Sequence, residues 1–216
     1  DTGINYVDTS IDYGRSERLI GEAIAGRRAE YFLASKCGCV FGSDATQPVG
    51  QRSDHVFTPE NVISGVNGSL ERLRTDYLDL VQFHISPSMQ TLRESGSLEA
   101  LKELQRAGKV RFIGMSGTQP HLADQIASGE FDVFQIPYSA LQREHEAAIA
   151  KASAAGAGII IRGGVSRGMP SDFENRRYYM QPGTLPKDRW EGASLDDLLN
   201  AMTRMEFSLR FTLSNP

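Results

Sequence analysis

The chain has 216 residues, of which 40% are hydrophobic and 23% charged, and its formal net charge is −4. This composition is typical of a globular protein, and the length fits one α/β domain over residues 1–216, since α/β barrels commonly span ~200 to 250 residues. The acidic balance argues against nucleic-acid binding. No apolar run approaches the ~20 residues of a membrane span and no segment resembles a signal peptide, so we expect a cytoplasmic protein.

Short apolar runs alternate with amphipathic stretches along the chain. This alternation is typical of right-handed βαβ units with a parallel sheet. The expected strands are residues 4–7, 31–34, 78–83, 110–115, 133–136 and 158–161.

The expected helices follow these strands. Ser16 is predicted to cap a helix whose buried face carries Leu19, Ile20, Ala23 and Ile24. Thr58 is predicted to cap a second helix, with Pro59 at its first position and Val62, Val66, Leu70 and Leu73 on its buried face. Further helices are expected over residues 98–106, 120–127, 144–154 and 195–207.

Two long loops, residues 38–57 and 163–192, follow predicted strands. Loops at the carboxyl ends of parallel strands form the active face of such folds. The second loop therefore predicts a wall for a substrate pocket; an irregular surface excursion is the alternative. Its large apolar residues are Met169, Pro170, Phe173, Tyr178, Tyr179, Met180 and Trp190.

Cys37 and Cys39 are the two cysteines of the chain. They are too close for an ordinary disulfide and too few for a closed zinc site, and no further Cys or His pair stands at ligand spacing. We therefore expect reduced thiols that pack near the site entrance, and no metal; a redox or metal role is the weaker alternative.

Four polar residues stand at, or shortly after, the ends of predicted strands: Asp8, Tyr13, Lys36 and His84. Taken singly, Lys36 could be a surface lysine and His84 a core histidine. Together they form the set that a proton relay requires, because a phenol is a weak acid near neutral pH and needs a cation and hydrogen-bonding partners to deliver its proton.

The segment GINYVDTSIDYGRSE at residues 3–17, continuing to Gly21, resembles the first signature of the aldo-keto reductase family. The resemblance extends over nearly the whole chain. It is supported by ASK at 34–36, by DYLDL at 76–80 leading to His84, by GKVR at 108–111 leading to GMS at 114–116, and by Gln135 with Tyr138.

The resemblance implies a TIM (β/α)8-type barrel and an NADP(H)-dependent reduction of a small aldehyde or ketone. Tyr13 would protonate the carbonyl oxygen, Lys36 would assist the loss of that proton, and Asp8 would hold Lys36. His84 would orient the carbonyl or join the proton path. By the same resemblance, Ser116 and Gln135 would contact the nicotinamide carboxamide. The loop after the sixth strand, with Arg162, Gly163, Gly164 and Gly168, would approach the cofactor.

Two residues depart from the family pattern. Gly117 stands where an asparagine often follows the serine, and Arg162 stands where a large aromatic commonly covers the nicotinamide, although a guanidinium can also stack on a ring. Tyr138 is expected to be a packing residue rather than a cofactor contact.

About six βα units are expected where a closed barrel of this type has eight. We therefore expect an incomplete barrel that lacks the first and eighth strands, and with them the site for the adenosine 2′-phosphate. Exposed sheet edges would favour a homodimer or another homo-oligomer. The leading functional hypothesis is an aldo-keto reductase; the alternatives are a self-associating fragment that binds NADP(H) poorly, and a non-enzymatic binding module.

Overall fold

The computed structural model describes residues 3–40, 54–165, 190 and 192–214. Six parallel strands form one sheet in the order β1-β2-β3-β4-β5-β6, so each strand pairs with the next one along the chain. The strands are β1 (Tyr6–Asp8), β2 (Phe32–Cys37), β3 (Leu78–Phe83), β4 (Val110–Ser116), β5 (Val133–Pro137) and β6 (Gly158–Arg162).

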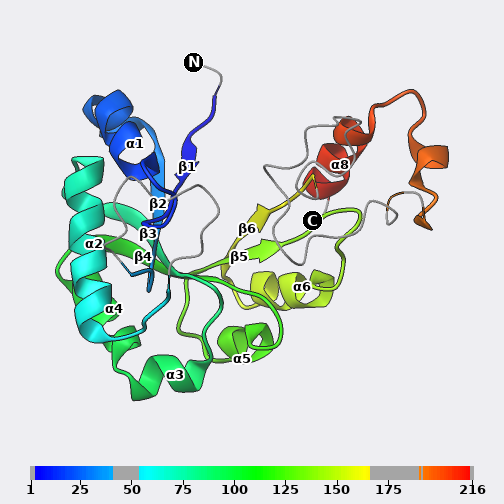
Figure 1. Cartoon of the computed structure of the whole chain (residues 1–216). Coiled ribbons are helices and arrows are strands. Elements are labelled where there is room, and N and C mark those ends of the chain that lie inside the picture. Colours follow the sequence, from blue (N-terminus) through cyan, green and yellow to red (C-terminus); the bar gives the residue numbers. More distant parts are fainter. Residues whose placement is uncertain (1–2, 41–53, 166–189, 191, 215–216) are drawn as a thin grey trace.

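Helices follow the strands and cover the outer face of the sheet (Figure 1). They are α1 (Ser16–Ile24), the 3-10 helix η1 (Ala25–Glu30), α2 (Pro59–Leu73), α3 (Met89–Glu94), α4 (Ser97–Arg106), α5 (Leu122–Ala127), α6 (Glu146–Ala154), the 3-10 helix η4 (Leu195–Leu198) and α8 (Arg204–Leu213). This architecture confirms the predicted α/β class with six βα units. None of the helices in the described ranges is long and apolar enough to cross a bilayer.

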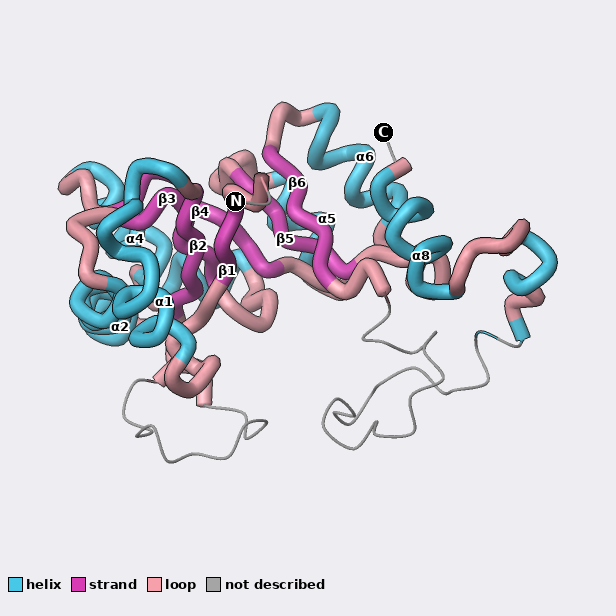
Figure 2. Tube along the Cα trace, turned by 90° about the horizontal axis from the view of Figure 1, so that it is seen from above, coloured by secondary structure: helices cyan, strands magenta, loops and turns pink. Residues whose placement is uncertain are grey.

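The core lies between the sheet and its helices. Leu33, Val81 and Ile113 project from three neighbouring strands and are buried with Leu101 of α4 and Val66 of α2. Viewed from above, strands β1 to β4 and their helices form one side of the wall, and β5 and β6 continue it toward α8 (Figure 2). The strands thus form part of a barrel wall. The expected association with a second copy of the chain stays a prediction.

The predicted start of α2 is confirmed. Thr58 is the N-cap, its hydroxyl accepts from the Asn61 N–H at 3.4 Å, and Pro59 occupies the first helical position, where a missing N–H costs nothing. All four residues predicted for its buried face are buried.

The prediction for α1 is wrong in two respects. Its N-cap is Arg15, and Ser16 is the first helical residue, whose hydroxyl accepts a hydrogen bond from Thr9 Oγ1 at 2.8 Å. Leu19 and Ala23 are exposed, whereas Glu17 and Gly21 are buried. The Glu17 carboxylate faces inward because it accepts from Ser35 Oγ at 2.6 Å and from Arg72 Nε at 2.7 Å.

Gly21 allows α1 to approach α2 closely. A Cβ at this position would clash with the backbone of Arg72 and Leu73 at the end of α2, so the helices can pack at this distance only without a side chain here. Gly26, in η1, has no heavy atom within 4 Å of the place where its Cβ would lie.

The amino end of the sheet is held by the buried carboxylate of Asp79, the second residue of β3. It accepts from the Leu33 N–H at 2.8 Å, from Arg28 Nη2 at 2.6 Å and from Arg111 Nη1 at 2.6 Å. One side chain therefore joins η1, β2, β3 and β4.

Several predicted boundaries were wrong. The expected strands 4–7 and 31–34 are shifted toward the carboxyl end, to Tyr6–Asp8 and Phe32–Cys37. The expected helix 195–207 is instead a 3-10 turn followed by a separate helix, which Thr203 caps by accepting from the Glu206 N–H at 3.1 Å. Helix α3 and the 3-10 helix η1 had not been predicted.

Candidate active site

The ammonium of Lys36 is the centre of the site. Lys36 lies in β2 and is 2% exposed, yet its charge is balanced: Nζ donates to Asp8 Oδ2 at 2.7 Å and to the Thr9 carbonyl at 2.8 Å. Asp8 ends β1, and parallel pairing sets β1 beside β2, which places the carboxylate within reach. The predicted contact between these two residues is confirmed.

Gln82 belongs to the same group, although the sequence reasoning missed it. It is fully buried in β3, and its Nε2 donates to Asp8 Oδ1 at 3.2 Å, so both carboxylate oxygens have partners. The available signal was that Gln82, like Asp79, is a polar residue within the mainly apolar run Leu78–Phe83.

The ring of Tyr13 lies next to the Lys36 ammonium, and the ring of His84 lies next to that of Tyr13. The Lys36 Nζ is 4.7 Å from the centroid of the Tyr13 ring, and the Tyr13 ring meets the His84 ring edge-on with centroids 6.1 Å apart. Tyr13 is 47% exposed, so its phenol is open to a ligand. The structure thus brings together all four residues that the sequence singled out for proton transfer.

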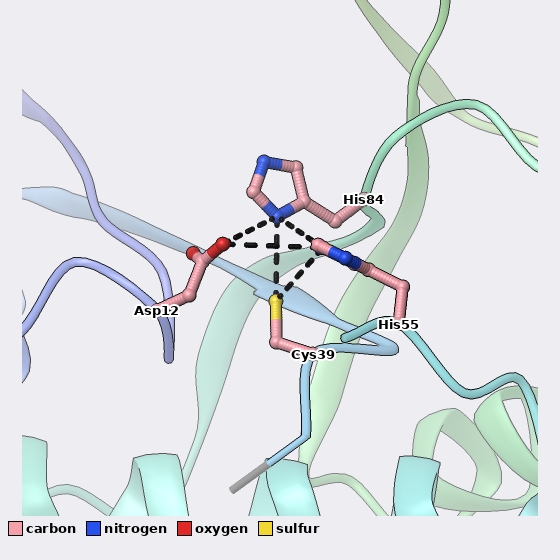
Figure 3. Close-up of side chains that lie close together, drawn as sticks. All are labelled: Asp12, Cys39, His55 and His84. Carbon is pink, nitrogen blue, oxygen red and sulfur yellow. Dashed lines mark hydrogen bonds and ion pairs between the residues drawn. The ribbon is translucent and has the colours of Figure 1, made fainter. Parts of the chain in front are cut away.

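The His84 ring has further neighbours that had not been predicted (Figure 3). Its Nδ1 is 3.3 Å from Cys39 Sγ, 3.2 Å from His55 Nε2 and 3.5 Å from Asp12 Oδ2. Burial lowers the pKa of His84 to about 4, and the charges of Lys36 and His55 act in the same direction while Asp12 opposes them. At neutral pH the imidazole is therefore uncharged.

The two cysteines are free thiols, as expected. Cys37 is fully buried in the core, and Cys39 is buried beside His84 and Ser10. Burial raises the pKa of Cys39 to about 12, and the neighbouring Asp12 carboxylate acts in the same direction.

The described residues that were predicted to hold a cofactor lie in the neighbouring strands β4, β5 and β6 or directly after β6. Ser116 and Gln135 are register partners and are both 4% exposed. Within the part of the chain that the structure describes, neither side chain makes a hydrogen bond, so their polar atoms could serve a carboxamide. Arg162 ends β6 and Gly163 follows with φ 72°.

Gly164 approaches α8, where Thr212 Oγ1 donates to its carbonyl at 3.2 Å. Gly168 lies outside the described residues, as do Met169, Pro170, Phe173, Tyr178, Tyr179 and Met180 of the predicted pocket wall. Trp190 is described: it is buried and packs edge-on against Phe207 of α8.

Tyr138 behaves as the packing residue that was predicted. It is 2% exposed, its ring stacks on Phe211 with centroids 5.6 Å apart, and its hydroxyl donates to Glu146 Oε1 at 3.1 Å.

Comparison with known proteins agrees with this arrangement. The model of the aldo/keto reductase family matches residues 1–209. The uncharacterized oxidoreductase YqkF of Bacillus subtilis is 27% identical over 209 residues, which are 95% of this chain and 65% of that protein. The NADH-specific methylglyoxal reductase of Escherichia coli is 32% identical over 154 residues, which are 67% of this chain and 47% of that protein.

Among solved structures, the holo form of the aldo-keto reductase AKR11C1 from Bacillus halodurans superposes with a TM-score of 0.80 at 26% identity, covering 99% of this chain and 70% of that one. The six-stranded wall is therefore part of a TIM-barrel fold. The chain spans about half to two thirds of the length of the curated relatives reported above. On the family match over residues 1–209, the chain belongs to the aldo/keto reductase family.

Proposed function

We propose that this chain carries the proton-donating half of an NADP(H)-dependent reduction of small aldehydes or ketones. The observation that carries the proposal is the buried Lys36 ammonium, which is held by Asp8 and Thr9 and lies 4.7 Å from the Tyr13 ring. Such a cation beside a half-exposed phenol has a chemical use, because it stabilises the phenolate that remains after Tyr13 gives its proton to a carbonyl oxygen.

The other residues have distinct parts in the proposal. Asp8 holds the ammonium in place through its hydrogen bond, and Gln82 donates to the second carboxylate oxygen of Asp8. His84 is uncharged at neutral pH, so it would donate a hydrogen bond to the carbonyl oxygen without competing as an acid.

The nicotinamide, when bound, supplies the hydride. Ser116 and Gln135 fit a carboxamide because they are buried and paired in register, and because their side chains make no hydrogen bond within the described ranges. Arg162, Gly163, Gly164 and Gly168 are proposed as the remaining cofactor contacts. A carbonyl substrate is supported by the relative that is named NADH-specific methylglyoxal reductase. Because of that name, NADH should be tested beside NADPH.

The test uses the purified 216-residue chain. Binding of NADPH and of NADH is followed by fluorescence, and turnover of a panel of small aldehydes and ketones is followed by the loss of reduced-nicotinamide absorbance. Tyr13→Phe is expected to lower turnover by ~10²- to 10⁴-fold and to leave cofactor binding unchanged. Tyr31→Phe is the matched control, because it removes a hydroxyl that donates to the Ile24 carbonyl away from the site.

Two outcomes would overturn the proposal. One is turnover by Tyr13→Phe at the rate of the unaltered chain. The other is the absence of any NADPH or NADH binding up to millimolar concentrations, which would favour the self-associating fragment.

A further inference from the structure

Four side chains from four separate segments place their donor atoms around one point. Asp12 follows β1, Cys39 follows β2, His84 follows β3, and His55 lies opposite Cys39 in an antiparallel bridge. One ligand atom of each lies within 4.8 Å of every other (Figure 3). The carboxylate, thiol and two imidazoles all converge on the same volume.

The spacing matches that of a tetrahedral transition-metal centre. Bonds of ~2.0 to 2.3 Å from zinc to nitrogen, oxygen and sulfur place the donors of a tetrahedron ~3.3 to 3.8 Å apart. Here Nδ1 of His84 is 3.3 Å from the Cys39 sulfur, 3.2 Å from Nε2 of His55 and 3.5 Å from Oδ2 of Asp12. Nε2 of His55 is in turn 3.6 Å from the sulfur and 3.9 Å from the carboxylate oxygen.

Hydrogen bonding alone does not account for this geometry. A ring nitrogen carries either one proton or one lone pair, so Nδ1 of His84 can make one good hydrogen bond. Three heavy atoms nevertheless lie within 3.5 Å of it. A cation at the centre would engage all four donors at once.

The surrounding contacts hold the donors in place, as the outer contacts of a metal site do. Ser10 Oγ donates to Asp12 Oδ1 at 2.5 Å, which leaves Oδ2 turned toward the histidines. The bridge between Cys39 and His55 is closed by two backbone bonds, from the Val40 N–H to the Asp54 carbonyl at 2.9 Å and from the Val56 N–H to the Gly38 carbonyl at 2.8 Å.

We propose that Asp12, Cys39, His55 and His84 bind one divalent zinc-like transition-metal ion. A thiolate, a carboxylate and two neutral imidazoles balance a charge of +2, and this donor set suits zinc rather than magnesium or calcium, which prefer oxygen ligands. The Cys39 thiol proton leaves to solvent when the metal–sulfur bond forms, and no oxidant or reductant takes part. For Cys39 we propose this role in place of the sequence-based expectation of a packing thiol and no metal, whereas Cys37 remains a packing residue of the core.

The ion would also act on the catalytic residues, a consequence that rests on the proposed function. With a metal on Nδ1, the His84 proton must sit on Nε2, the nitrogen that points away from the cluster in Figure 3. Asp12 immediately precedes Tyr13, so its coordination would fix the turn that carries the proton donor. We therefore assign His55 and Cys39 as positioning residues.

The test is metal binding to the full chain without cofactor or substrate, so that its result does not depend on catalysis. The chain is freed of metal with a chelator under reducing conditions and titrated with Zn²⁺ against a chromophoric competitor, and separately with Co²⁺. We expect one equivalent of either ion and, with Co²⁺, the intense near-ultraviolet band of a thiolate ligand together with the visible bands of tetrahedral coordination.

Variants locate the site. Cys39→Ser and His55→Gln are each expected to weaken Zn²⁺ binding by at least ~100-fold, and Cys39→Ser to abolish the thiolate band. Cys37→Ala is the matched control, since it removes the other thiol from the core and should bind Zn²⁺ as the unaltered chain does. Circular dichroism checks that each variant is folded. If Cys39→Ser does not fold, His55→Gln alone tests whether Zn²⁺ binds at this cluster.

Any of three results would overturn the proposal. The first is Zn²⁺ binding that survives both substitutions in folded protein, and the second is a Co²⁺ spectrum without a thiolate band. The third is a Zn²⁺ affinity of the unaltered chain that is no higher than that of His55→Gln.

Discussion

The ion pair of Lys36 and Asp8 makes a quantitative prediction about stability that is independent of catalysis. The side chain of Lys36 is 1% exposed and that of Asp8 24%, and the charged atoms are 2.7 Å apart. Two unit charges ~3 Å apart attract by roughly 5 kcal/mol at an effective dielectric constant of about 20. Partial exposure of Asp8 reduces this, so we expect a coupling energy of ~2 to 3 kcal/mol.

A double-mutant cycle with Asp8→Asn and Lys36→Met measures this coupling. Asp8→Asn leaves a buried ammonium without its carboxylate, and Lys36→Met leaves a carboxylate without its cation, so each should lower the free energy of unfolding by ~3 kcal/mol. The double variant should cost about as much as either single one, because it buries no unbalanced charge. Urea denaturation, with unchanged m-values as the sign of two-state unfolding, provides the three differences.

The exposed pair of Arg106 and Glu99 is the internal control. Its nitrogen and oxygen are 2.6 Å apart, similar to the buried pair, but the side chains are 61% and 60% exposed. The same cycle there should give less than ~1 kcal/mol. If the costs of Asp8→Asn and Lys36→Met simply add to within ~0.5 kcal/mol, the reasoning about the buried pair is refuted.

Two further predictions concern packing and pH. Gly21→Ala should lower the free energy of unfolding by ~1 to 3 kcal/mol, because the added methyl group meets the rigid backbone of α2. Gly26→Ala is the control and should change the free energy of unfolding by less than ~0.5 kcal/mol. Equal effects of the two substitutions in chemical denaturation would contradict the packing argument. His145 is 4% exposed, both ring nitrogens are buried and have no hydrogen-bond partner among the described residues, and burial lowers its pKa. Its unfolded state therefore binds the proton more tightly, so its contribution to stability is present above the unfolded pKa of ~6.5 and is lost as the pH falls. His145→Leu should reduce the loss of stability on acidification below that pH. A stability–pH curve identical to that of the unaltered chain would show that this buried imidazole is not responsible.

The strand ends explain why much of the site could be predicted from the sequence. Parallel strands with short apolar cores bring their carboxyl ends to one edge, so Asp8, Lys36 and His84 had to meet once the strands were identified. Ser116 and Gln135 were singled out by the resemblance alone, and their register pairing is a finding of the structure.

The cluster around His84 could not be predicted in this way. Asp12, Cys39 and His55 come from turns after different strands, and no short spacing such as Cys-x-x-Cys links them. Their meeting depends on the antiparallel bridge that turns His55 back toward Cys39, a tertiary contact with no local signal. The inward-facing Glu17 was missed for a similar reason, because its partners Ser35 and Arg72 lie on other elements.

From the contacts of Asp79 we expect the two ends of the sheet to tolerate changes in sequence to different degrees. The Asp79 carboxylate joins η1, β2, β3 and β4 at the amino end, opposite the end for which we propose the chemistry. We expect that turns at the opposite edge can be exchanged, lengthened or given new ligands while Asp79 keeps the register of these strands. Within such a scaffold, substrate preference can diverge between descendants without each change having to re-establish how the strands are aligned.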